Sequence, residues 1–265
     1  ERTLAVGEAM GIVTVEPAAK SRLAVSVRFP KIAALPAIIA RVRRVFDLAA
    51  DPDAISSHLA RDAALAPLVM AKPGLRVPGA WDGFELAVRA ILGQQITVGA
   101  ARGLAAKLVA AHGEALPESL AREGLTRVFP SARRLAEVDF AALGMPRARA
   151  AALGALTAAV NEDPLIFGPR RGLEEAVAAL KALPGVGEWT AQYIAMRELR
   201  EPDAFPAADV GLMRALADPR GRRPTPAELS ARAEAWRPWR AYAALHLWSS
   251  EAAPSKEIAN ERAAA

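Results

Sequence analysis

The sequence predicts an α+β protein, in which a small antiparallel sheet at the N-terminus precedes a mainly helical body. Runs of β-branched residues typical of strands are confined to residues 1–30, whereas helical spacing of apolar residues begins at Ile38 and recurs as far as Trp248. With 265 residues, of which 52% are hydrophobic and 24% charged, the chain is long enough to bury a core.

The sheet is predicted from two runs, residues 11–15 and 23–29, which are joined by the turn-like segment 16–20. A two-stranded hairpin is only marginally stable, so it needs a further strand or a helical layer. A loop rich in proline and glycine at residues 72–79 marks the predicted boundary with the helical remainder. We therefore expect an N-terminal sheet-plus-helix domain over residues 1–72, a helical region of two subdomains over 73–252 and a flexible tail over 253–265.

The helices are predicted from capping residues and apolar spacing. Five helix starts are marked by a side chain that can accept from the free N–H groups of the first turn: Asp51, Asp82, Thr97, Asp209 and Thr225. The helix from Asp82 breaks at residues 93–97, and the helix from Thr97 ends at Gly113. Further helices are expected at 131–142, 147–160, 173–183 and 188–199, and a last one runs from Pro238 to Trp248.

Composition excludes several kinds of site. The chain has no cysteine, which rules out disulfides, cysteine nucleophiles, thiolate zinc sites and iron–sulfur clusters. The three histidines are too scattered to predict a metal site. No apolar run is long enough to span a membrane, and the N-terminus lacks a signal-peptide pattern. A net charge of +5 and a pI of 9.9 favour a polyanionic partner, although a coding bias toward arginine explains them equally well.

The sequence LPGVG at residues 183–187 predicts a tight hairpin between two helices. Pro184 is expected to end the first helix, and Gly185 and Gly187 allow backbone conformations that other residues resist. The free N–H groups at the start of the next helix face the same side, so a phosphate can bind there without any sequence being read. A turn with a purely structural role explains the same residues, and both interpretations stay open at this stage.

Asp209 lies twenty-two residues after Gly187, at the start of an apolar helical run. An aspartate there is a good N-cap, and a capping carboxylate can also act in catalysis. Trp189 and Tyr193 are four residues apart on one helix face, where they either stack on a base or pack in the core. Residues 214–240 carry seven arginines and three acids, which indicates either a phosphate-facing surface or a solvated helical face.

Taken together, these motifs resemble the helix–hairpin–helix DNA glycosylases, and within them the 3-methyladenine DNA glycosylase II (AlkA) family. The resemblance rests on the hairpin, the sequence WTA at 189–191 and Asp209. It extends over residues 4–248 through LAVGE at 4–8, PGLRVPG at 73–79, RAILGQ at 89–94, LGMP at 143–146, WRPWR at 236–240 and LHLW at 245–248.

The resemblance implies a monofunctional glycosylase. It would hydrolyse the N-glycosidic bond of alkylated bases, such as 3-methyladenine and 7-methylguanine, in duplex DNA and leave an abasic site for base excision repair. Bifunctional relatives carry a lysine nucleophile where this chain has Trp189, and usually a cysteine-bound cluster, so no lyase activity is expected. A glycosylase for deaminated purines and a non-catalytic DNA-binding protein are the alternatives.

The resemblance also implies roles for individual residues of the pocket and the wedge. Asp209 is expected to face the deoxyribose C1′ as the catalytic carboxylate, where it stabilises oxocarbenium charge or orients the attacking water. The pocket for the extruded base is assigned to Trp248, Tyr193 and Trp189. The wedge that enters the duplex is assigned to Gln95, flanked by Gln94 and Ile96.

The phosphate beside the lesion is assigned to the hairpin residues Gly185, Val186, Gly187 and Thr190. A Na⁺, K⁺ or Mg²⁺ ion is expected on the main-chain carbonyls of Lys181, Leu183 and Val186. The chemistry itself requires no cofactor.

The chain departs from the family pattern at several points. Gln95 is polar where the familiar relative has leucine, Ala208 stands where a second aspartate is common, and Glu188 stands where a basic residue is common and is expected to weaken the phosphate grip. The chain begins where the family's first strands should already have passed, so the sheet is expected to be truncated and one pocket wall to be missing. We expect a monomer that is cytoplasmic and associated with the nucleoid, with duplex DNA as its partner and no membrane contact.

Overall fold

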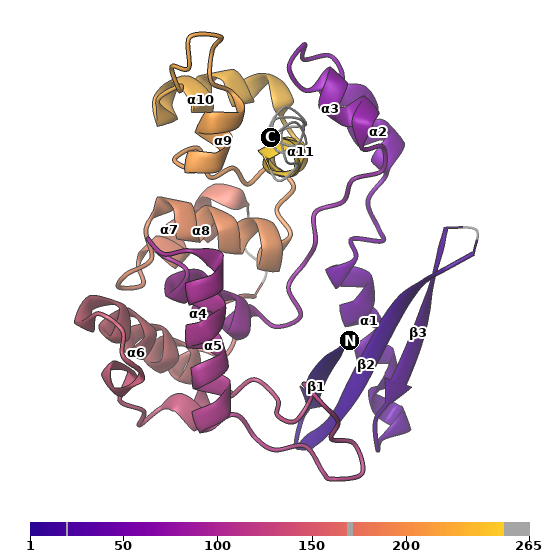
Figure 1. The fold of residues 1–265 in the computed structure, drawn as a ribbon, viewed down its shortest axis with the longest axis vertical. Helices are drawn as coiled ribbons and strands as arrows, with labels where there is room; N and C mark the ends of the chain where they lie inside the picture. Colours follow the sequence, from indigo (N-terminus) through magenta and orange to yellow (C-terminus); the bar gives the residue numbers. More distant parts are fainter. Residues whose placement is uncertain (20, 169–171, 252–265) are drawn as a thin grey trace, which may run out of the picture. The chain divides into compact units, whose positions relative to one another are not determined.

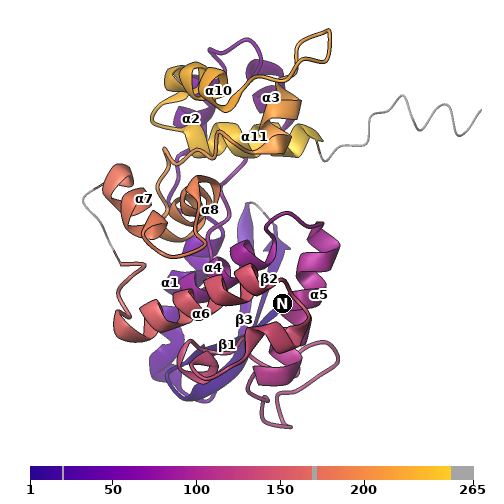
Figure 2. The same cartoon turned by 90° about the vertical axis from the view of Figure 1, so that its left-hand side faces the viewer.

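The computed structural model describes residues 1–19, 21–168 and 172–251, and it divides the chain into two compact units (Figures 1 and 2). The first unit consists of residues 1–42, 82–166 and 183–185, and the remaining described residues form the second. Each unit therefore combines segments that are distant in sequence. The predicted tail at 253–265 lies outside the described residues, and the predicted domain boundary at 72 remains a prediction.

The first unit carries a three-stranded antiparallel sheet in the order β1-β2-β3 (Figure 1). Its strands are β1 (Arg2–Val6), β2 (Ala9–Ala18) and β3 (Arg22–Arg28). The first strand is not predicted from the sequence. It joins β2 through a tight turn at Gly7, whose φ of 61° is a conformation that glycine adopts without strain. The turn predicted at 16–20 is shorter in the structure, because β2 continues to Ala18 and pairs with Arg22.

One helix of the first unit is almost completely buried. This is α4 (Gly83–Leu92), in which nine of the ten residues are buried and which packs against its neighbours α5 and α6. Asp82 and Thr97 cap α4 and α5 as predicted, because each side chain accepts a hydrogen bond from a first-turn N–H. The remaining elements are η1 (Ile32–Ala34), α1 (Leu35–Val45, of which residues 43–45 belong to the second unit), α5 (Val98–His112), η2 (Arg133–Leu135), η3 (Phe140–Leu143) and α6 (Arg147–Glu162).

The helix predicted over residues 131–142 is wrong. The structure has two short 3-10 turns there, η2 and η3. Asp139 interrupts the apolar spacing by accepting a hydrogen bond from the N–H of Ala141, and Gly144 ends the second turn in a left-handed conformation with φ of 80°. Local side-chain capping thus outcompetes a continuous helix.

All the regular elements in the described residues of the second unit are helices, which are joined by turns and loops. Asp51 caps α2, and Thr225 and Glu228 form the predicted capping box of α10. The predicted helix at 188–199 is α-helical only to Ile194 and continues as a π-helical turn, and the last helix begins at Arg240 rather than at Pro238. The elements are α2 (Pro52–Leu59), α3 (Ala66–Ala71), α7 (Leu173–Lys181), α8 (Glu188–Ile194), η4 (Ala195–Leu199), α9 (Val210–Ala215), α10 (Pro226–Ala233), η5 (Glu234–Trp236) and α11 (Arg240–Glu251).

Two general expectations can be compared with the described part of the chain. No described helix is both long and apolar enough to cross a membrane. Within the same residues, no cluster of three or more histidine, aspartate or glutamate side chains has the arrangement of a metal site.

Candidate active site

Asp209 lies at the N-cap of α9, as predicted. Its backbone is extended, with φ of −71° and ψ of 125°, and its Oδ1 accepts a hydrogen bond of 2.9 Å from the N–H of Leu212. The cap fixes the carboxylate relative to α9, because the oxygen that caps the first turn belongs to the candidate catalytic group. The capping interpretation is therefore confirmed, and it leaves the catalytic interpretation open.

Two indole groups hold the carboxylate of Asp209 from different parts of the chain. Trp189 in α8 donates its Nε1–H to Oδ2 at 2.8 Å, and Trp248 in α11 donates its Nε1–H to Oδ1 at 2.8 Å. Indole nitrogens are donors only, so both bonds are directed toward negative charge on the carboxylate. α9 and α11 pack directly against each other, which brings Trp248 to a residue 39 positions earlier.

Trp189 is also stacked on Tyr193, one helical turn further along. The two ring centroids lie 5.1 Å apart and the ring planes are 8° from parallel. One more turn along the chain, Arg197 places its guanidinium 5.4 Å from the tyrosine centroid and donates to its hydroxyl at 3.0 Å. Tyr193 thus has neighbours at i−4 and i+4, and Trp189 is the end of the stack that reaches Asp209.

The carboxylate of Asp209 carries no cationic partner among the described residues; its three hydrogen bonds all come from neutral N–H groups. The side chain is only partly buried, and the residue that follows it, Val210, is a large hydrophobic side chain that is 54% exposed. A negative charge that is fixed in place, not neutralised and reachable from outside can stabilise positive charge in a substrate.

The predicted hairpin forms between α7 and α8. Gly185 has a φ of 81°, and a Cβ added to it would lie 2.3 Å from the Cβ of Ala152 in α6. Both facts require glycine, so the structural interpretation of this residue is supported. Gly187, in contrast to the prediction, has an extended backbone with φ of −82° and ψ of 177°, which any residue can adopt. It is exposed and a Cβ there would meet nothing within 4 Å, which leaves its backbone open to a ligand. Thr190 and Val186, in contrast, are buried.

Glu188, at the first turn of α8, forms a salt bridge with Lys181 at 2.6 Å and accepts a hydrogen bond from Gln192 at 3.0 Å. The hydrogen bond from Lys181 is the main cause that holds the pKa of Glu188 below its ordinary value, so the residue is ionised at neutral pH. Lys181 offsets the negative charge that the sequence places beside the hairpin.

The residues predicted as the wedge occupy a turn between α4 and α5. Gln95 is exposed and has a left-handed backbone with φ of 57°. The side-chain amide of Gln94, by contrast, donates to the main-chain carbonyl of Gly185 at 2.9 Å. The main-chain carbonyl of Gln94 accepts a hydrogen bond from Arg149 at 2.5 Å. Gln94 therefore ties the turn to the hairpin, whereas Gln95 projects from it.

Most of the aromatic and basic residues near the C-terminal end of the described chain are buried or ion-paired. Trp236 and Tyr242 are buried, so both belong to the core. Five of the seven arginines in residues 214–240 pair with carboxylates, which favours a solvated, ion-paired face over a surface reserved for phosphate: Arg214, Arg222, Arg232, Arg237 and Arg240.

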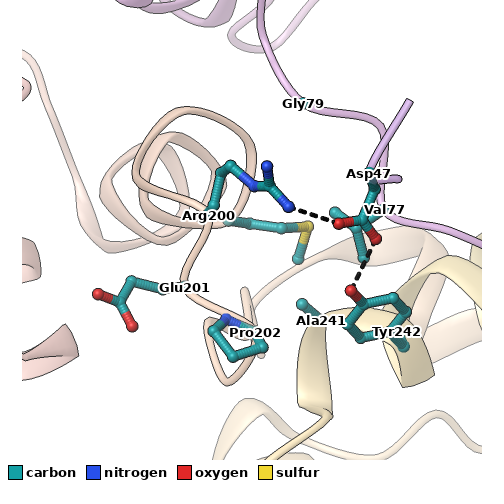
Figure 3. A pocket seen from close by; sticks show the side chains of 9 residues that line it. Asp47, Val77, Gly79, Arg200, Glu201, Pro202, Ala241 and Tyr242 are labelled. Atoms are coloured by element: carbon teal, nitrogen blue, oxygen red, sulfur yellow. Dashed lines mark hydrogen bonds and ion pairs between the residues drawn. The ribbon is translucent and has the colours of Figure 1, made fainter. Parts of the chain in front are cut away.

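A second carboxylate, Asp47, was not singled out by the sequence. It is 3% exposed, and it binds Arg200 through Oδ1 and the hydroxyl of Tyr242 through Oδ2, both at 2.7 Å (Figure 3). A cavity of about 40 Å³, enough for a bound water, lies beside these side chains. Burial, followed by the hydrogen bond to Asp47, raises the pKa of Tyr242 well above its ordinary value.

The fold is that of the helix–hairpin–helix glycosylases. The structure superposes on the 3-methyladenine DNA-glycosylase from Archaeoglobus fulgidus with a TM-score of 0.80, covering 93% of this chain and 85% of that one at 22% sequence identity. At this level of identity the likeness establishes the fold alone.

Sequence comparison then identifies the family. Residues 1–82 match the AlkA N-terminal domain and residues 88–241 match the HhH-GPD superfamily base excision DNA repair protein, and the chain belongs to this superfamily. The chain is 38% identical to the DNA-3-methyladenine glycosylase 2 of Escherichia coli over 257 residues, which are 94% of this chain and 85% of that protein.

A longer relative is also similar. The chain is 45% identical over 215 residues to the "Probable bifunctional transcriptional activator/DNA repair enzyme AlkA" of Mycobacterium tuberculosis, and the match covers 80% of this chain and 42% of that protein. The chain thus spans less than half the length of this relative.

Proposed function

We propose that this protein is a monofunctional DNA glycosylase that hydrolyses the N-glycosidic bond of alkylated bases in duplex DNA and leaves an abasic site. The observation that carries the proposal is the carboxylate of Asp209, held by the indoles of Trp189 and Trp248 and not paired with a cation among the described residues. Membership of a base excision DNA repair superfamily and the similarity to a DNA-3-methyladenine glycosylase support it.

Asp209 supplies the charge that the reaction requires. Departure of a base from C1′ develops positive charge on the deoxyribose, and a fixed carboxylate stabilises that charge in a site of low dielectric. An N3- or N7-alkylated purine is cationic and already a good leaving group, so the reaction needs no separate general acid. Three N–H donors occupy much of the lone-pair capacity of Asp209, which favours electrostatic stabilisation over proton abstraction from water.

The aromatic stack supplies the surface for the extruded base. Tyr193 lies between Trp189 and Arg197, so the ring that a base can reach beside Asp209 is that of Trp189, together with Trp248. Stacking on an electron-rich indole favours an electron-poor, cationic base and tolerates several lesion shapes. We therefore propose that Tyr193 supports Trp189 and contacts the base only at its edge.

No lyase step is proposed, because position 189 holds an indole whose N–H is already donated to Asp209. A lyase needs an amine that forms a Schiff base with C1′. The alkylated duplex is the proposed partner, with Gln95 as the wedge because it is the exposed member of its turn.

The hairpin is proposed as the grip on the phosphate backbone, through the exposed main chain at Gly187. The carbonyls of Lys181, Leu183 and Val186 each accept no main-chain hydrogen bond from the described residues, so each is available as an oxygen ligand. A bound Na⁺, K⁺ or Mg²⁺ ion would supply positive charge to the phosphate there and take no part in bond cleavage.

The test is release of free base from a methylated duplex. The protein is incubated with DNA treated with a methylating agent, and the released bases are separated by chromatography, with undamaged DNA as the control and a hypoxanthine duplex in parallel. We expect 3-methyladenine and 7-methylguanine to appear while the strands stay intact until alkali is added, and no protein–DNA adduct to form with borohydride.

Two outcomes would overturn the proposal. Release of hypoxanthine without any methylated base would assign the site to deaminated purines. Salt-dependent binding to the duplex without release of any base would assign the chain to a DNA-binding role. A light-scattering measurement of the free protein tests the separate prediction that it is a monomer.

A further inference from the structure

Gly211 is the second residue of α9, two positions after Asp209. The conformation of the backbone does not explain why this residue is a glycine. Its φ is not among the positive values that the described glycines adopt, so an alanine fits the main-chain conformation. Glycine also weakens a helix relative to alanine. Neither turn geometry nor helix stability therefore accounts for a glycine at this position.

The surroundings of Gly211 do account for it. A Cβ added there would lie 3.0 Å from Oδ1 of Asp209 and 3.3 Å from Cδ1 of Trp248. These are the two groups that meet in the hydrogen bond of 2.8 Å between the Trp248 indole and the carboxylate. The missing side chain is what leaves room for the indole edge to lie over the first turn of α9.

One of the two neighbours must yield if the space is filled. Asp209 is held from two other directions, by the N–H of Leu212 at 2.9 Å and by the indole of Trp189 at 2.8 Å. Among the described residues, the indole of Trp248 makes one hydrogen bond at this place, the bond to Asp209 itself. Trp248 is therefore the group that moves, and its hydrogen bond is the one that lengthens.

We propose that Gly211 is a positioning residue, whose lack of a side chain allows Trp248 to orient the carboxylate of Asp209. This inference rests on the function proposed above, since it assigns to Gly211 an effect on the same site. A shift of a few tenths of an ångström at the carboxylate matters because catalytic groups act within narrow limits of distance and direction.

The experiment compares Gly211→Ala with Gly103→Ala. Gly103 lies in the interior of α5, where an added Cβ meets nothing within 4 Å. The control therefore makes the same chemical change in a helix where no side chain has to move. The first readout is the indole N–H region of the ¹H–¹⁵N spectrum, with Trp189 and Trp248 assigned from Trp→Phe variants. We expect the Trp248 signal to move upfield in Gly211→Ala, as the bond lengthens, and to stay in place in Gly103→Ala.

The second readout is the single-turnover rate of base release, together with the affinity for an undamaged duplex. Gly211→Ala is expected to lower the rate about tenfold without a change in duplex affinity or a fall in melting temperature. Gly103→Ala is expected to keep the wild-type rate. An unmoved Trp248 signal, or a moved signal with a rate within about twofold of wild type, overturns the inference.

The two proposals fail separately. If the wild-type protein releases no base, the proposed function fails, whereas the indole spectrum still decides whether Gly211 determines the position of Trp248. If the wild type is active and Gly211→Ala keeps both the signal and the rate, only the inference on Gly211 fails.

Discussion

Two aspartates of the second unit are held in similar ways and have opposite consequences. Asp47 and Asp209 each use both carboxylate oxygens and each accept from an aromatic side chain. The difference is a cation: Asp47 pairs with Arg200 at 2.7 Å, whereas Asp209 has only neutral N–H donors among the described residues. The charge of Asp47 is neutralised by Arg200 within the protein, whereas the charge of Asp209 remains available to a substrate.

Asp47 and Asp209 also differ in exposure and in backbone conformation. Asp47 is 3% exposed, and both it and Arg200 have left-handed backbones, with φ of 50° and 61°. Non-glycine residues hold that conformation only where their surroundings fix them. Asp209 is partly exposed and sits in the ordinary extended conformation of an N-cap. Asp47 is thus a structural carboxylate, and Asp209 carries the features of a reactive one.

Asp47→Asn is expected to have the largest effect on stability. The substitution leaves Arg200 without its partner, and removal of one member of a buried pair costs several kcal/mol. We expect the free energy of unfolding to fall by about 3 kcal/mol, toward the low end of the range for buried pairs, because the side chain of Arg200 is 31% exposed. Urea unfolding measures the loss. The rate of base release by the folded protein should stay the same, and a selective loss of that rate would contradict the division between the two sites.

Trp189→Phe and Trp248→Phe are expected to reduce the rate of base release by about tenfold to a hundredfold each. Phenylalanine keeps an aromatic surface and removes the N–H that is donated to Asp209, and a hydrogen bond to a charged group contributes about 1.5–3 kcal/mol. Single-turnover kinetics measure the effect.

Trp239→Phe is the matched control, since Trp239 packs edge-on against Tyr242 and is not one of the two indoles that donate to Asp209. It should keep the wild-type rate. Equal losses in all three variants would show that ring packing, and not the indole N–H, is responsible.

Tyr242→Phe is expected to destabilise the protein by about 1–2 kcal/mol at neutral pH, because the buried carboxylate of Asp47 loses its hydroxyl donor. The effect depends on pH. Since the folded protein raises the pKa of Tyr242 above the ordinary 10.0, the stabilisation is complete below pH 10 and is lost as the pH rises above it. Unfolding curves from pH 8 to 11 should show a steeper decline for wild type than for the variant, and parallel curves would contradict this.

Thr225→Ala is expected to have the smallest effect. Thr225 and Asp209 are both N-caps, but Thr225 only caps, through the reciprocal bonds with Glu228. Loss of a cap costs about 1 kcal/mol. Thermal unfolding measures this cost, and the rate of base release should be unchanged.

Capping residues were predictable from the sequence because their chemistry is local. Asp51, Asp82, Thr97, Asp209 and Thr225 all act on N–H groups two or three residues away, and all five are confirmed. The helix predicted at 131–142 failed for the same reason, since the cap at Asp139 overrides the apolar spacing. The strand β1 has no strong local signal and depends on its pairing with β2.

The organisation of the site was predictable only in part. The resemblance to a family supplied Asp209 and the aromatic residues, but not the bonds that join them, which connect residues 20 and 39 positions apart. Arg197 could have been found from its i+4 spacing to Tyr193 on one helix face. Asp47 and Gly211 have no such signal, because their roles come from packing between helices.

The central claim is that the charge of Asp209, and not its capping role, drives base release. Asp209→Asn tests it most directly, because asparagine is also a good N-cap and has nearly the same shape. We predict that the variant melts close to the wild-type temperature and releases 3-methyladenine on the order of a thousandfold more slowly in single-turnover assays. Release at the wild-type rate by a correctly folded Asp209→Asn protein would contradict the account.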